Sequence, residues 1–390
     1  MFILFNAASL VAIFCIFLAW THKWLSRSSW RAQKQKAEEE VRKVTLPHSS
    51  ASSEGPVSSP APVREKPKYR ITMGLKRMDK AGWLIVDENY SARHQVRANL
   101  FNNRNREVSQ CLPEAKDACD EALKEVSSFL CRTYPDMFEL KESASGTIVR
   151  NKLMGEEFPL ENSTISPLEA AARLAMEDMT ILLKNDSGDH YVYVVSIYKS
   201  NKLVTHFRQI IVLNLLMILC RAATSSAFLI GWSANTRMGS TLNEMHAPVP
   251  QWARQIAFSV NKFMARLTPE SPMERSSYFV QVIQPNEPWE SIFFQPEGLL
   301  QDHTIPTPER VLIRRERQTF NRLPKTNGIL FTVKTTVSFL EDLPLSELQL
   351  LAKDIESWPE DMAAYKGRSH WGETISNFCR VKEATYDVVC

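Results

Sequence analysis

The chain has few of the short motifs that identify common enzyme classes. Its seven cysteines form no Cys-x-x-Cys pair, so a tetrahedral zinc site has no support. Only 12 glycines occur in 390 residues, and none builds a dinucleotide-binding Gly-x-Gly-x-x-Gly or a phosphate-binding P-loop pattern. The cysteine count is odd, and the thiols are interpreted as reduced and structural, as in a cytosolic compartment.

The chain also lacks a broad excess of one charge. Of its 47 basic and 44 acidic residues, nine and five lie in residues 1–66, which leaves 38 and 39 for the rest. The body is therefore close to neutral, whereas nucleic-acid-binding domains carry a wide basic surface. We expect no nucleic-acid partner.

One long apolar run stands at the N-terminus. Residues 2–20 contain only Asn6 and Ser9 as polar residues and would span about 28 Å as a helix, which is close to one hydrocarbon core. Basic residues follow the run and none precedes it, which predicts a single-pass anchor in membrane lipid with the body facing the cytosol. The short span favours a thin bilayer such as the endoplasmic reticulum. A cleaved signal peptide is the alternative, but the basic n-region is missing.

The remaining order follows from composition and periodicity. Residues 1–24 are interpreted as the anchor, 25–67 as a basic and then Ser/Pro-rich linker, and 68–390 as the body. Helices and strands alternate without a strict βαβ rhythm, so we expect an α+β body. Ser166 and Ser346 are predicted helix N-caps. The predicted helices are 113–132, 166–183, 251–267 and 346–357, and the predicted strands are 278–283, 311–319 and 328–336.

The predicted strand 311–319 is unusually rich in arginine. Period-2 alternation puts Val311, Ile313, Arg315, Arg317 and Thr319 on one face, and Gln318 with its neighbours on the other. Guanidinium groups beside apolar residues can bind carboxylates or phosphates. The alternative is a solvated edge strand with ordinary ion pairs.

Several separated motifs resemble one family, the haem-dependent oxidative N-demethylase-like proteins, also called the HRQ family. The similarity runs from Tyr69 to Trp371 and rests on the segments Met73-Gly-Leu-Lys-Arg-Met-Asp79 with Trp83 and Asp87-x-x-Tyr90, Gly239-x-x-Leu242-x-x-Met-His246-x-Pro-Val-Pro250, Glu316-Arg-Gln-Thr-Phe-Asn-Arg-Leu-Pro324 and Phe331-Thr-Val-Lys-Thr335. The resemblance implies a PAS-like mixed sheet with flanking helices that holds haem b. It also implies O₂ activation at the iron, oxidation of an N-methyl group on a small amine, and electrons from a separate flavin or iron–sulfur reductase. The chain has no dinucleotide motif of its own, in agreement with an external redox partner.

The resemblance suggests roles for five residues. His246 would be the axial iron ligand, because two following prolines fix its loop. Arg315 and Arg317 would bind haem propionates or an anionic substrate group, and Gln318 and Thr319 would contact bound oxygen or substrate as catalytic residues. The alternatives are a loop histidine bonded to backbone, surface ion pairs, and ordinary cross-strand hydrogen bonds.

Residues 194–220 depart from the family pattern as an insert of about 27 residues. We hypothesise a retained intron translated in frame, because joining His190-Tyr-Val-Tyr193 to Arg221 restores the family spacing. The rival hypothesis for the whole protein is a haem-free PAS-like sensing or scaffold module on a membrane, since folds of this kind host both roles.

Overall fold

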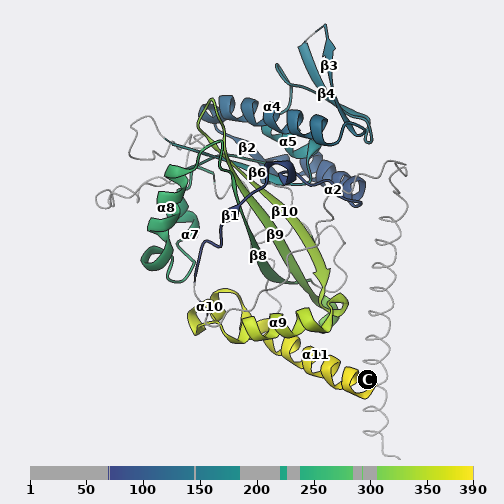
Figure 1. Ribbon diagram of the computed structural model, residues 1–390, viewed down its shortest axis with the longest axis vertical. Coiled ribbons are helices and arrows are strands. Elements are labelled where there is room, and N and C mark those ends of the chain that lie inside the picture. Colours follow the sequence, from purple (N-terminus) through teal and green to yellow (C-terminus); the bar gives the residue numbers. More distant parts are fainter. Residues whose placement is uncertain are drawn as a thin grey trace, which may run out of the picture.

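The residues that the computed structural model describes are 69, 71–144, 146–184, 220–225, 238–283, 292 and 305–389. Within them, helices surround two antiparallel sheets, so the expected α+β class is confirmed (Figure 1). The PAS-like arrangement stays a prediction. The predicted anchor, the linker and nearly all of the insert lie outside the described residues. In the described part of the chain, no helix has the length and apolar character needed to cross a membrane.

The larger sheet has seven antiparallel strands in the order β1-β8-β9-β10-β6-β7-β2. Its two long central strands form a hairpin that pairs from Ile329 opposite Arg322 to Phe339 opposite Leu312. The predicted strand pair is therefore confirmed, and each strand extends three residues further at its C-terminal end. The bounds are β1 Lys76–Arg77, β8 Met273–Val282, β9 Val311–Arg322, β10 Ile329–Phe339, β6 Asp178–Leu183, β7 Cys220–Ser225 and β2 Ser109–Cys111.

Strand β9 pairs with β8 on one edge and with β10 on the other. Its backbone N–H and C=O groups are used on both sides, and most of its side chains are buried. The alternative interpretation of this segment as a solvated edge strand is wrong, because sheet pairing places it in the interior of the sheet. Arginines in such a strand must find partners inside the fold.

The turn between β9 and β10 is held by Glu121 of helix α4 (Lys116–Thr133). The Glu121 carboxylate accepts hydrogen bonds from the backbone N–H of Lys325 at 2.7 Å and of Thr326 at 2.8 Å, and from the Thr326 hydroxyl at 2.6 Å. Hydrogen bonds to a charged acceptor are shorter and stronger than neutral ones. Helix α4 therefore fixes the position of the hairpin that carries the arginines.

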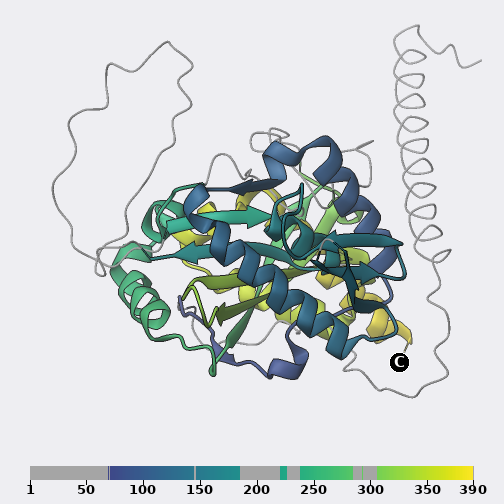
Figure 2. The same ribbon diagram turned by 90° about the horizontal axis from the view of Figure 1, so that it is seen from above.

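Three groups of helices pack against the large sheet, each through its own apolar cluster (Figures 1 and 2). The first group meets β6 and β10 and contains α2 (Tyr90–Asn103), α4 and α5 (Pro167–Leu174). The second lies beside the hairpin turn and contains α7 (Leu242–His246) and α8 (Ala257–Arg266). The third covers the start of β9 and contains α9 (Leu345–Glu356), α10 (Glu360–Tyr365) and α11 (Arg368–Val389). A smaller sheet contains β3 (Phe138–Ser143), β4 (Gly146–Asn151) and β5 (Glu156–Pro159).

The helix predicted over 113–132 is confirmed. A 3₁₀ turn at Pro113–Ala115 leads directly into α4, which ends at Thr133 before Tyr134-Pro135. A residue before proline disfavours the helical conformation, which explains the end of the helix. The apolar stripe of α4 is buried against the sheet and consists of Cys119, Ala122, Leu123, Val126, Phe129 and Leu130.

The helix predicted over 166–183 is only half correct. Helix α5 ends at Leu174, and Asp178–Leu183 form strand β6, which pairs with β10. Local propensity was overridden because this buried segment completes the sheet between β10 and β7. Ser166 is the N-cap residue of α5, as predicted, but the predicted capping box is wrong, because the Ser166 side chain makes no capping hydrogen bond and Glu169 pairs with Arg173. The second predicted cap is wrong, because Pro344 rather than Ser346 is the N-cap of α9.

Candidate functional site

The hairpin β9–β10 presents two chemically different faces. Arg315, Arg317 and Thr319 point to the side of α4 and the segment 80–90, together with Lys334 of β10; we call this the α4 face. Arg314, Glu316, Gln318 and Phe320 point to the opposite side, where α8 packs at one end; we call this the α8 face. The alternation predicted from the sequence is confirmed, so the two predicted catalytic residues lie on opposite sides of the sheet.

On the α4 face, Arg317 is surrounded by acceptors of this chain. Its Nε donates to the Glu274 carboxylate at 2.7 Å, and its terminal nitrogens donate to the carbonyls of Trp83 at 2.8 Å and Gly82 at 2.7 Å. These bonds tie the segment after β1 to the centre of the sheet. The role of Arg317 at a haem propionate stays a prediction. Its contacts in the structure hold the segment 82–83 against β9 and β8.

Arg315 is similarly engaged near α9. It forms an ion pair with Glu347 and donates to the Ser338 hydroxyl at 3.0 Å. Its side chain is only 6% exposed, so the pair is largely desolvated. Binding a further carboxylate here would require Arg315 to exchange Glu347 for the ligand. Its predicted role also stays a prediction.

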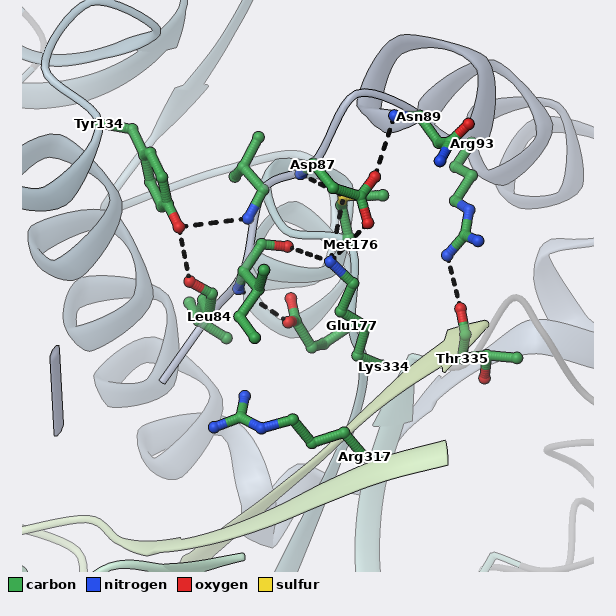
Figure 3. A network of polar contacts seen from close by, with 12 residues as sticks. Leu84, Asp87, Asn89, Arg93, Tyr134, Met176, Glu177, Arg317, Lys334 and Thr335 are labelled. Carbon is green, nitrogen blue, oxygen red and sulfur yellow. Dashed lines mark hydrogen bonds and ion pairs between the residues drawn. The ribbon is translucent and has the colours of Figure 1, made fainter. Parts of the chain in front are cut away.

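The most elaborate polar network on the α4 face centres on Lys334 (Figure 3). Its ammonium group lies 2.7 Å from the Asp87 carboxylate and donates to the Ile85 carbonyl at 2.7 Å. Burial raises the pKa of the Asp87 carboxyl, but the charges of Lys334 and Arg93 outweigh it and bring the pKa below its ordinary value. Asp87 and Lys334 stand 247 positions apart in the sequence, in two of the motifs named above.

Glu177 lies in the same network and was not recognised from the sequence, because its segment was predicted to be helical. One carboxylate oxygen accepts from the Ile85 backbone N–H at 3.1 Å, and the other has no hydrogen-bond partner among the described residues. Burial raises the pKa of Glu177, although Lys334 acts in the opposite direction. A buried carboxyl beside a buried ammonium is able to hold or release a proton.

On the α8 face, Gln318 is fixed by three neighbours. Its amide nitrogen donates to Glu316 at 2.9 Å and to the Ser277 hydroxyl at 3.4 Å, and its oxygen accepts from Arg275 at 2.6 Å. Thr319, on the α4 face, shares a 2.6 Å hydrogen bond with Thr332 across the hairpin. The contacts with Ser277, Arg275 and Thr332 are the cross-strand hydrogen bonds that the alternative interpretation predicted. The catalytic roles of Gln318 and Thr319 stay predictions.

Arg275 is the residue on this face that the sequence reasoning missed. It lies in β8, whose predicted start at residue 278 excluded it. Its guanidinium carbon is 5.9 Å from the centre of the Phe320 ring, and only its Nε has a hydrogen-bond partner in the described part of the chain. Burial lowers the pKa of Arg275, and Glu316 partly offsets this. Extending the alternation of β8 backwards from Tyr278 would have found it.

His246 ends the short helix α7, which begins with a capping box formed by Thr241 and Glu244. The His246 Nδ1 lies 2.7 Å from the Leu242 carbonyl, and the ring stacks on Trp252 with centroids 4.0 Å apart at 11°. A carbonyl only accepts, so Nδ1 carries the proton in this contact. The role of His246 as an iron ligand stays a prediction.

Two hollows lie elsewhere on the described surface. One of about 450 Å³ lies between α9, α10 and α11, and one of about 260 Å³ lies between Trp83, Phe129 and the hairpin turn. Neither is lined by His246 or by the predicted residues of β9 at positions 315–319. Among the described residues, no group of three or more His, Cys, Asp or Glu side chains is arranged to hold a metal ion.

Comparison with known families gives a match over most of the chain. The matching family is described as "Haem-dependent oxidative N-demethylase, alpha subunit-like", and the matched residues are 74–204 and 217–376. Both the α4 face and the α8 face lie inside the matched segments. The break between the two segments falls within the 194–220 insert.

Proposed function

We propose, from the premise that this chain belongs to the haem-dependent oxidative N-demethylase alpha-subunit-like family, that it binds haem b and oxidises an N-methyl group of a small amine. The observation that carries the proposal is the α8 face, where an apolar end adjoins a cationic end. The apolar end is formed by α8 with Phe320 and Phe331. The cationic end is formed by Arg275, next to Arg314, which is itself paired with Glu316 at 3.3 Å.

The donor groups fit a haem. A porphyrin is apolar across its plane and carries two carboxylates at one edge, which matches a surface divided in this way. Arg275 supports the fit best, because its guanidinium has no carboxylate partner of its own among the described residues and can donate hydrogen bonds to an external carboxylate. The earlier assignment to Arg315 and Arg317 is weaker, since both already contact carboxylates of this chain.

His246 fits the role of iron ligand by its hydrogen bonding. The Nδ1 contact with Leu242 makes Nε2 the nitrogen that would bind iron, and the stacked Trp252 restricts rotation of the ring. A ligating histidine commonly donates its other ring N–H to a carbonyl in this way. Haem bound here would supply the activation of O₂, which no side chain of the protein provides.

Residues of the chain would then bind and orient the substrate. Gln318 is held by Glu316, Ser277 and Arg275. Glu316 and Ser277 use both hydrogens of its amide group, so only its amide oxygen presents a fixed acceptor on the α8 face. Glu316 is partly exposed and anionic, and it would attract a protonated amine. We propose that electrons arrive from a separate flavin or iron–sulfur reductase, and that residues 2–20 anchor the body to a membrane on its cytosolic side, at the endoplasmic reticulum. Thr319, on the other face, would act only through the hairpin.

Haem titration of the full chain tests the proposal. We expect a saturable Soret band, and we expect His246→Ala to weaken binding by at least about tenfold, while the matched control His370→Ala on α11 leaves it unchanged. Absence of a Soret band, or a band that is the same in His246→Ala and wild type, would overturn the assignment of His246.

The carboxylate site is tested separately with haem and its dimethyl ester, which lacks both charges. Charge-assisted hydrogen bonds contribute about 1.5–3 kcal/mol, so wild type should prefer haem by roughly 10- to 100-fold. Arg275→Gln should lose this preference, whereas Arg150→Gln on the exposed strand β4 should keep it. Equal preference in Arg275→Gln and wild type would remove Arg275 from the site.

The haem-free scaffold is the second candidate, and the internal pairing of Arg315 and Arg317 favours it. These contacts need no ligand and hold α9 and the segment 82–83 against the sheet, although the buried Nε of Arg315 has no hydrogen-bond partner among the described residues. This candidate would be supported by a full chain that folds and binds no haem, both as wild type and as Arg275→Gln.

A further inference from the structure

Two thiols meet where the edge strand β2 joins helix α4. The Sγ atoms of Cys111 and Cys119 lie 3.5 Å apart, within thiol hydrogen-bond distance. Cys111 is the last residue of β2, and Cys119 lies in the first turn of α4, with the 3₁₀ turn Pro113–Ala115 between them. In the described part of the chain, this is the one contact between cysteine sulfurs.

The two thiols have opposite surroundings. Cys111 is exposed, whereas Cys119 is fully buried under the apolar stripe of α4. The hydrogen bond between the two thiols lowers the pKa of Cys111 despite the opposing effects of burial, Asp120 and Glu114, and the same bond raises the pKa of Cys119. The solvent-accessible sulfur is thus the one that loses its proton first, which is the arrangement of an attacking thiolate with a resolving thiol behind it.

We propose that Cys111 and Cys119 form an oxidation site that reacts with hydroperoxides and closes a reversible disulfide between β2 and α4. In the first step, the Cys111 sulfur attacks one oxygen of hydrogen peroxide, the O–O bond breaks, and a sulfenic acid and water are formed. In the second step, the Cys119 sulfur attacks the Cys111 sulfur, the S–O bond breaks, and a second water leaves. Two thiols lose two electrons, and one peroxide gains them.

Little movement is needed for the second step. A disulfide requires a sulfur–sulfur distance of about 2.05 Å, so the sulfurs, now 3.5 Å apart, must approach by roughly 1.5 Å. The bond would close a short loop through Pro113 and fasten the outermost strand of the large sheet to the helix that holds the β9–β10 turn. Oxidation at the surface would therefore stiffen the support of the hairpin. The inference does not depend on haem binding.

Cys131 offers an internal comparison. It lies near the end of the same helix and is partly exposed, and burial raises its pKa. With no second thiol at contact distance among the described side chains, it lacks both the activation and the resolving partner. Cys379 is buried, and its pKa is also raised by burial. These thiols should react more slowly with peroxide than Cys111.

The test is peroxide treatment of the reduced full chain, followed by alkylation of the remaining thiols and peptide mass spectrometry. Wild type and the control Cys131→Ser should yield a linked peptide pair containing Cys111 and Cys119, which dithiothreitol separates. Cys111→Ser should yield no link. Cys119→Ser should accumulate a sulfenic acid at Cys111 that dimedone traps, which identifies the attacking residue even if one variant folds poorly.

Three results would overturn the proposal. They are modification of Cys131 before Cys111, conversion of Cys111 to sulfinic acid without any linked peptide, and complete retention of both thiols while other residues oxidise. Circular dichroism of each variant shows whether a negative result comes from a folded protein. A linked pair that forms only after denaturation would also count against the site.

Discussion

Replacing Lys334 by methionine would remove the central cation of the Figure 3 network and leave its acceptors in place. The Lys334 side chain is 4% exposed, and its ammonium lies 2.7 Å from Asp87. Breaking a buried ion pair costs about 3–5 kcal/mol, and the orphaned Ile85 carbonyl adds a further penalty of about 1–3 kcal/mol. Asp87 remains 28% exposed, so hydration of its carboxylate offsets part of this loss of stability. Methionine also retains the apolar stem of the lysine side chain. We expect a net loss of about 2–4 kcal/mol.

The same chain provides a matched control. Lys124 and Glu161 form an ion pair at the same 2.7 Å distance, but their side chains are 43% and 67% exposed. Exposed pairs contribute little to stability, so Lys124→Met should change the free energy of unfolding far less than Lys334→Met. Urea denaturation of the full chain at neutral pH measures both variants.

A double-mutant cycle with Asp87→Asn separates the pair from the surrounding burial. If the two side chains interact as the geometry indicates, the double variant should be more stable than the sum of the single losses by at least about 1 kcal/mol. Equal losses for Lys334→Met and Lys124→Met, or a coupling energy near zero, would refute the view that this network holds the segment 82–87 on the sheet.

Three further predictions concern the same region. Burial raises the pKa of Glu177 in the folded protein, so its contribution to stability is full below the ordinary value of 4.5 and is lost as pH rises above it. The stability of wild type relative to Glu177→Gln should therefore fall as pH rises above about 4.5, and a flat difference would contradict the burial argument. Glu121→Ala should cost about 2–4 kcal/mol in urea denaturation, since two backbone N–H groups of the hairpin turn lose a charged acceptor, while Glu125→Ala on the same helix should cost less than about 1 kcal/mol. Thr319→Val should destabilise more than the double variant with Thr332→Val, because the single change leaves one buried hydroxyl without its partner; an additive result would count against the 2.6 Å bond.

The sequence predicted the elements whose signals are local and long. Alternation over 311–319 identified β9 and its two faces, and the apolar stripe of α4 identified that helix and its buried side. The family motifs also indicated which segments matter, since Asp87, Arg317 and Lys334 all belong to them. Local rules failed at β6, where a segment that resembled a helix continuation completes the sheet.

The sequence by itself thus determined the α+β class, the hairpin with its alternating charges, and the family. Only the tertiary structure decided which charges meet. It paired Arg315 with Glu347 and Arg317 with Glu274, joined Asp87 to Lys334, and left Arg275 on the α8 face without such a carboxylate partner among the described residues. The physical reason is that strand periodicity fixes the side to which a residue points, whereas the partner it finds there comes from distant segments. Burial then makes each such pairing obligatory, because an unpaired charge inside the fold costs several kcal/mol.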